Sequence, residues 1–146
     1  MPLATQSPQR QRWQPDDTHP MASLPPPVFE RIQRPWGWYE TLGSGEGYLV
    51  KRLLIFKGSR ISLQRHQHRC EHWVIVAGEG ELQVEQTCMP AIPGTSLFIP
   101  KQALHRAAAG LSDLQIVEVQ RGALLSEDDI ERLADDFGRP MGQAMS

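Results

Sequence analysis

The chain has 146 residues, of which 40% are hydrophobic and 22% are charged, a composition typical of one globular domain. Its formal net charge of -2 gives no sign of a basic surface, so we expect neither nucleic-acid binding nor membrane binding. The sequence lacks an apolar run close to the roughly 20 residues that span a bilayer, and its first residues lack the apolar core of a secretory signal. We therefore expect a cytoplasmic protein.

The first 27 residues differ from the rest of the chain. They hold seven of the twelve prolines and almost no periodic apolar pattern. Such a segment does not bury enough apolar surface to offset the entropy of folding. We predict a disordered arm over residues 1–27 and one domain over residues 28–146.

Short apolar segments separated by Gly and Pro turns follow in the domain. In the first of them, Lys51 alternates with Leu53 and Ile55, so its side chain shares a face with apolar residues. This spacing of short strands favours an all-β barrel or sandwich. The predicted strands cover 48–56, 61–68, 71–77, 81–86, 96–99, 104–108 and 114–120.

The C-terminal region has the one helical pattern. Ser126 and Asp129 resemble a capping box, and Ile130, Leu133 and Phe137 recur on one helical stripe. We predict a short helix there.

One polar segment concentrates the residues suited to chemistry. If residues 61–68 form a strand, Gln64, His66 and His68 share a face on which a core strand would carry Val or Ile. Glu71 follows closely. Imidazole nitrogens and a carboxylate favour a divalent ion such as Zn, Fe, Mn or Ni over Ca, so the segment indicates a metal site.

The two cysteines form no Cys-x-x-Cys pair and signal neither a disulfide framework nor a structural zinc site. Cys70 lies between His68 and Glu71, but we interpret it as a small buried hydrophobe rather than a ligand.

Two spaced blocks resemble the paired metal-binding motifs of the cupin superfamily. The first block reads Gly58, five residues, Gln64, one residue, His66, four residues, Glu71, six residues, Gly78; the second reads Gly94, five residues, Pro100, one residue, Gln102, two residues, His105. In cupins, the first block supplies two His and a Glu, and the second one His, to a single metal inside a small barrel. The resemblance implies a cupin barrel, a jelly-roll-like double-stranded β-helix, with His66, Glu71 and His105 as ligands.

The fourth ligand stays open. Gln64 takes the place of the first cupin histidine, and its neutral amide oxygen is a weaker ligand that favours a harder ion. His68 is the alternative if the strand bulges, and it also suits a proton shuttle. The expected cofactor is one divalent ion, Zn or else Mn, Co, Mg, Fe or Ni.

A closer resemblance covers residues 30–139. The matching segments are similar to the type II mannose-6-phosphate isomerase domain, usually the C-terminal part of a bifunctional enzyme with a mannose-1-phosphate guanylyltransferase. They are Arg34-Pro35-Trp36-Gly37, Val50-Lys51-Arg52, Ser62-Leu63-Gln64, His66-x-His68-Arg69-x-Glu71-His72-Trp73, Glu118-Val119-Gln120, and Glu127-Asp128-Asp129-Ile130 through Phe137-Gly138-Arg139.

The resemblance implies a metal-dependent interconversion of mannose 6-phosphate and fructose 6-phosphate through an enediol, a step toward GDP-mannose and polysaccharides. A nucleotide-binding Gly-rich loop of the guanylyltransferase type is absent from this sequence, so we expect a stand-alone isomerase. A sugar phosphate is then the expected partner.

Such an isomerase needs cations for the phosphate and a base for the proton. Lys51, Arg69, Lys101 and Arg139 are the candidate cations. Lys51 is preferred because of its inward face, and Arg139 resembles the family's terminal Gly-Arg, which folds back over the pocket mouth. Glu118 is either the base or a structural carboxylate.

Two other functions stay open. One is a non-catalytic metal-binding cupin module that binds a sugar or regulates a partner, because fold does not fix function. The other is a related enzyme for another sugar phosphate or a small acid. Trp36, Trp38 and Trp73 suit a sugar site, although core or interface packing is the preferred interpretation. Because edge strands of small barrels are commonly buried by pairing, we expect a homodimer.

Overall fold

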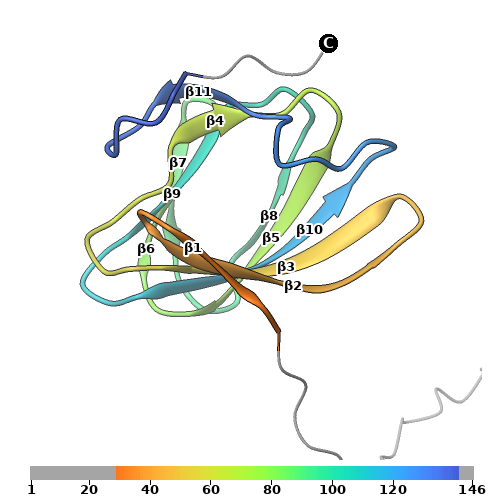
Figure 1. Cartoon of the computed structure of the whole chain (residues 1–146). Coiled ribbons are helices and arrows are strands. Elements are labelled where there is room, and N and C mark those ends of the chain that lie inside the picture. The colour runs from red at the N-terminus through yellow and green to blue at the C-terminus, as the bar shows by residue number, and fades with distance from the viewer. Residues whose placement is uncertain (1–28, 142–146) are drawn as a thin grey trace, which may run out of the picture.

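The computed structural model describes residues 29–141, so the arm predicted over 1–27 lies outside the described residues. Within this part, the chain forms eleven strands in two sheets, which confirms the all-β prediction. Figure 1 shows the two sheets curving around a common interior.

The six-stranded sheet has the order β1-β2-β3-β10-β5-β8. Its strands are β1 (Arg31–Arg34), β2 (Gly37–Gly45), β3 (Tyr48–Ile55), β10 (Leu114–Arg121), β5 (Cys70–Ala77) and β8 (Ser96–Ile99). The five-stranded sheet has the order β11-β4-β9-β6-β7. Its strands are β11 (Glu131–Ala134), β4 (Leu63–Arg65), β9 (His105–Ala109), β6 (Gly80–Val84) and β7 (Thr87–Ala91).

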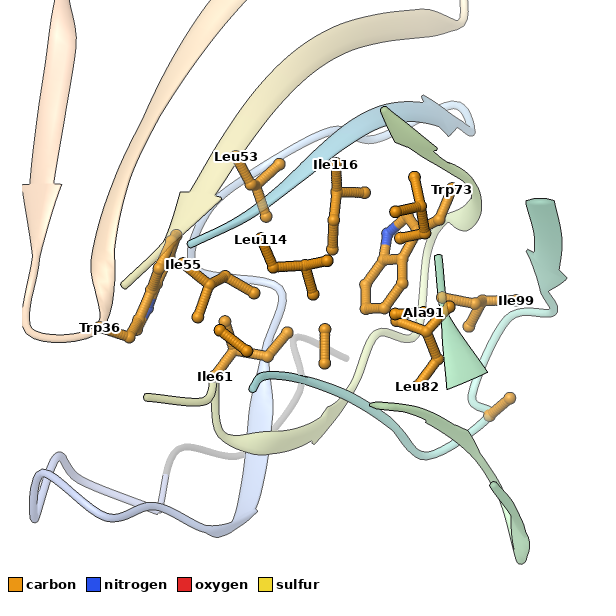
Figure 2. Packing of buried hydrophobic residues seen from close by; sticks show 14 residues of the cluster. Trp36, Leu53, Ile55, Ile61, Trp73, Leu82, Ala91, Ile99, Leu114 and Ile116 are labelled. Carbon is orange, nitrogen blue, oxygen red and sulfur yellow. The ribbon is translucent and has the colours of Figure 1, made fainter. Parts of the chain in front are cut away.

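The hydrophobic core lies between the sheets and follows from strand alternation. On β3 and β10, every second residue points inward, and Ile55, Leu114 and Ile116 are fully buried. Figure 2 shows these side chains meeting inside the barrel, with Trp36 at one end of the cluster and Ile99 at the other. Burial of this apolar surface is the main favourable contribution to folding.

The predicted C-terminal helix is wrong. The segment turns and then continues as β11, which pairs with β4. Ser126 Oγ accepts the amide of Asp128, a local turn rather than a capping box. The carboxylate of Asp129 accepts the amides of Gln67 and His68 at 2.9 Å each, so this acid is tied to a distant loop. Side-chain contacts to the backbone compete with helix formation in this way.

The strand predicted over 61–68 is shorter in the structure. Strand β4 ends at Arg65, and His68 lies in the bend that follows. The alternation expected to place His68 beside His66 therefore does not extend to it.

Asp135 holds the chain after β11. Arg139 donates to its carboxylate through the backbone amide and Nε, both at 2.8 Å, and through Nη2 at 2.9 Å. Hydrogen bonding to Arg139 lowers the pKa of Asp135 from 3.8 to about 2.

This ion pair predicts a loss of stability in acid. Because the folded-state pKa is depressed, the carboxylate stabilises the fold above about pH 4, and the effect disappears as the pH falls toward 2. We expect the stability difference between wild type and Asp135→Asn to shrink by about 1 to 2 kcal/mol over that window, as measured by urea unfolding. A difference independent of pH would contradict the assignment.

The outer face of the six-stranded sheet carries apolar side chains. Val74, Val76 and Phe98 are 42%, 44% and 52% exposed, on the side opposite the core. The homodimer stays a prediction, and a face of this kind is compatible with one. In the described range 29–141, there is no helix long and apolar enough to cross a membrane.

Candidate active site

The inward face of the six-stranded sheet changes from apolar to polar along three neighbouring strands. Past the core residues, the register places Glu118 of β10 between Lys51 of β3 and Trp73 of β5. One step further, Gln120 lies opposite Glu71. All five are buried, so the alternation that builds the core also carries a row of polar groups into the interior.

The second sheet provides the facing wall. Gln64 of β4 lies between Arg132 of β11 and His105 of β9 in the strand register. His66 follows directly after β4 and is 2% exposed. The structure therefore brings residues from both sequence blocks to one place inside the barrel.

Three of the four expected metal ligands converge. Ligand atoms of His66, Glu71 and His105 all lie within 4.8 Å of one another, and all three residues are buried. Glu71 is central, because its two oxygens lie 3.1 Å from His66 Nε2 and 3.6 Å from His105 Nε2.

Backbone carbonyls orient both imidazole rings. Nδ1 of His66 lies 2.6 Å from the carbonyl oxygen of Asp129, and Nδ1 of His105 lies 2.9 Å from that of Ala103. When Nδ1–H donates to a carbonyl, the Nε2 lone pair is directed toward the centre, the usual arrangement of metal-binding histidines. Burial lowers the pKa of His105 to about 4, which keeps this ring neutral at physiological pH.

The donor set fits a divalent cation. His105 Nε2 is buried and has no hydrogen-bond partner among residues 29–141. Glu71 and His66 already contact a cation, because the Arg69 guanidinium lies 3.0 Å from Glu71 Oε1 and 3.3 Å from His66 Nε2. Two imidazoles and a carboxylate with lone pairs turned to one point suit Zn, Fe, Mn or a similar ion.

The fourth ligand stays a prediction. Gln64 lines the same pocket as His66, and its Oε1 accepts a hydrogen bond from Ser62 Oγ at 2.8 Å. His68 is outside the three-residue cluster. Cys70 is also outside it, with Sγ 3.7 Å from the carbonyl oxygen of Arg121. Gln64 is therefore the better placed candidate.

Glu118 is held beside the cluster by two donors. Trp73 Nε1 donates to Glu71 Oε2 at 3.0 Å and to Glu118 Oε1 at 2.9 Å, and Gln120 Nε2 donates to Glu118 Oε2 at 3.0 Å.

The pKa values of the two neighbouring carboxyl groups are shifted in opposite directions. Burial, followed by the nearby Glu71 charge, raises the pKa of Glu118 to about 8. Burial acts in the same direction on Glu71, but His66 and His105 outweigh it and hold its pKa well below the ordinary value. The two pKa values are thus moved in opposite directions, a pattern typical of acid–base sites.

A pocket open to solvent reaches this cluster at His66, which is among its lining residues. Lys51 lines it and contacts Glu127, with Nζ 4.2 Å from the centre of the Tyr39 ring. Arg139 also lines the pocket. Lys101 is exposed in the turn after β8 and is not among the lining residues.

The three tryptophans divide between core and pocket. Trp36 belongs to the core and also lines the pocket. Trp73 is a core residue, while Trp38 lies under the guanidinium of Arg31 at 4.0 Å. Core packing therefore accounts for most of their surface.

Sequence reasoning missed Asp129, Arg34 and Arg132 as site residues. Asp129 was assigned to a helix cap, and Arg132 becomes a pocket residue because residues 131–134 form a strand. Arg34 and Asp129 both stand in matching family segments, which was the available signal.

The two sheets with an interior His/Glu cluster define the class of protein. An RmlC-like cupin from Shewanella frigidimarina superposes with a TM-score of 0.61 at 18% identity, covering 68% of this chain and 87% of that one. At this identity, the likeness shows the fold alone. The fold is a cupin barrel, which confirms the class predicted from the two blocks.

Sequence similarity then identifies the family. The family model described as "Mannose-6-phosphate isomerase C-terminal" matches residues 27–135, and the chain belongs to this family. The alginate biosynthesis protein AlgA of Pseudomonas aeruginosa is 40% identical over 115 residues, 78% of this chain and 24% of the relative. A mannose-1-phosphate guanylyltransferase of Sinorhizobium fredii is 42% identical over 109 residues, 74% of this chain and 21% of the relative. The chain thus spans about a quarter of the length of these relatives.

Proposed function

We propose that this chain is a metal-dependent isomerase that interconverts mannose 6-phosphate and fructose 6-phosphate. The observation that carries the proposal is the buried cluster of His66, Glu71 and His105, which lies beside Glu118 in a pocket lined with cations. Membership of the mannose-6-phosphate isomerase family supports the substrate.

His66, Glu71 and His105 would hold the divalent ion, with Gln64 as the fourth candidate. When bound, such an ion supplies Lewis acidity to a sugar oxygen that gains negative charge. The isomerisation itself moves a proton between C1 and C2 of the sugar through an enediol.

Glu118 is the proposed carrier of that proton. Hydrogen bonds from Trp73 and Gln120 fix both of its oxygens, so the carboxyl group has a defined position on the pocket wall. A positioned carboxyl group close to a reacting carbon contributes through general acid–base catalysis.

Lys51 and Arg139 are the proposed substrate contacts. Lys51 is buried, while its partner Glu127 is about half exposed in its side chain and can turn toward solvent when a ligand enters. Arg139 is fixed by Asp135, which leaves a guanidinium on the pocket wall in a set orientation. Both groups favour an anionic ligand.

The test is conversion of mannose 6-phosphate to fructose 6-phosphate by the purified chain. We expect a chelator to abolish turnover, and one of Zn, Mn, Co, Mg, Fe or Ni to restore it. Metal binding without turnover under any of these ions would instead support the non-catalytic module.

Glu118→Gln tests the proton carrier. The amide keeps the shape and the contact with Trp73 but does not exchange a proton, so we expect kcat to fall by about 100-fold or more. Metal affinity should change little. Glu81→Gln, at an exposed position on β6, is the matched control and should keep wild-type turnover. Equal turnover in the two variants would remove Glu118 from the mechanism.

A further inference from the structure

The cations of the pocket are not equally neutralised. Three of them are paired with carboxylates: Lys51 with Glu127, Arg69 with Glu71, and Arg139 with Asp135. Arg34 and Arg132 also line the pocket. Neither of these two has a carboxylate partner among residues 29–141.

The contacts of these two arginines are with neutral groups, including the Tyr39 ring, whose centre lies 5.3 Å from Arg34 Cζ. Arg132 Nη1 donates to the carbonyl oxygen of Pro140 at 3.4 Å, while its Nε is buried and has no partner within the described part of the chain. Arg34 donates to the carbonyl oxygen of Gln33 at 3.0 Å and to the Tyr39 hydroxyl at 3.4 Å. Both guanidinium groups therefore line the pocket without an ion pair to a carboxylate of residues 29–141.

The guanidinium groups also lie close enough to repel one another. Burial, then Arg139 and also Arg34, lower the pKa of Arg132, while Asp135 and Glu127 act in the opposite direction. A buried donor without a partner costs free energy, and so does a cluster of like charges. An anion bound among these groups would relieve both costs.

The position of Arg132 separates this cluster from the metal ligands. Arg132 lies opposite Gln64, which in turn lies opposite His105. Two strand spacings, about 10 Å, thus separate the backbone of Arg132 from that of His105. The pocket is lined both by Arg132 and by His66 of the metal-ligand cluster, so one ligand with an anionic group and a distant hydroxyl or carbonyl group can reach both.

We propose that Arg34 and Arg132, with Arg139 beside them, form a binding site for a phosphate monoester. Arginine suits this role because its planar fork donates two parallel hydrogen bonds to phosphate oxygens. The choice of a sugar phosphate as natural ligand rests on the proposed function, whereas the anion site itself does not. Arg34 and Arg132 then select phosphorylated over free sugar.

Inorganic phosphate is the probe for this site. We would titrate it into the full-length chain by calorimetry at low ionic strength, with and without a chelator, so that binding at a metal ion is distinguished. Wild type should bind phosphate in both conditions. Arg132→Gln and Arg34→Gln should each weaken binding by about tenfold or more, the cost of a lost charge-assisted contact.

Arg65→Gln is the matched control. Arg65 lies on the neighbouring strand β4, pairs with Glu131 at 2.7 Å and is absent from the pocket lining, so its loss should leave phosphate affinity unchanged. Thermal unfolding checks that each variant folds. Arg34 and Arg132 belong to different sheets, so either variant alone can decide the question.

The outcomes separate this site from the isomerase. Phosphate affinity that is unchanged in both arginine variants would overturn the anion site, even if the chain isomerises mannose 6-phosphate. Phosphate binding that depends on both arginines, in a chain that does not isomerise, would leave the site intact and refute the proposed reaction. If both proposals hold, Arg132→Gln should raise KM about tenfold and change kcat less.

Discussion

His105→Ala is expected to weaken divalent-metal binding by at least about 100-fold and to abolish isomerisation. The histidine is one of three converging donors, it is fully buried, and its Nε2 has no other partner among the described residues. Alanine leaves only His66 and Glu71 of the three clustered donors. Metal affinity, measured by competition with a chromophoric chelator, is the direct readout.

His72→Ala is the control for this experiment. His72 follows Glu71 on β5, but its ring packs against Phe98 at 4.8 Å, on the face away from the cluster. This variant should keep wild-type metal affinity. Tight metal binding by His105→Ala would show that the cluster of His66, Glu71 and His105 is not the metal site.

Asp129→Ala is expected to destabilise the fold by about 3 kcal/mol and to weaken metal binding as well. Asp129 is 0% exposed, and its two carboxylate oxygens accept the amides of Gln67 and His68. Without them, two backbone donors next to the metal cluster lose their partners. We expect the main chain of Asp129 to shift as well, and its carbonyl oxygen lies 2.6 Å from His66 Nδ1.

Urea unfolding and metal titration together test this prediction. Asp128→Ala is the matched control, since Asp128 is exposed and its stability effect should stay within about 0.5 kcal/mol. Asp129→Asn keeps one acceptor oxygen and should fall between the two. Equal stability of Asp128→Ala and Asp129→Ala would contradict the role of Asp129 as a link between the C-terminal segment and the site.

Local patterns predicted β3 to β6 and β8 to β10, because burial repeats every second residue, but they missed β1, β2 and β7 as well as β11. The inward position of Lys51 follows from its alternation with Leu53 and Ile55, and the structure confirms that face. The block spacing predicted His66, Glu71 and His105 as metal ligands, and their ligand atoms lie within 4.8 Å of one another. These features depend on short-range sequence periodicity and on two motifs, which a single sequence contains.

The C-terminal segment was mispredicted for a physical reason. Its apolar spacing and capping residues fit a helix locally. Pairing with β4 and the hydrogen bonds of Asp129 stabilise the strand conformation more than the local helix preference opposes it. These partners lie more than sixty residues earlier in the chain, so no local pattern reports them. Because this segment was predicted as a helix, Arg132 was not predicted as a pocket residue.

The sequence by itself determined the all-β class, the inward face of Lys51 and the candidate metal donors His66, Glu71 and His105, because side-chain chemistry, strand alternation and motif spacing can be read from the sequence. Tertiary structure alone decided that Lys51 of β3 pairs with Glu127, 76 residues later in the chain. It also placed Arg34 and Arg132, from different sheets, in the lining of one pocket without a carboxylate partner among residues 29–141. Arg69 and Arg139, in contrast, pair with Glu71 and Asp135, which are close to them in sequence. The long-range placements depend on distances that only the closed barrel sets.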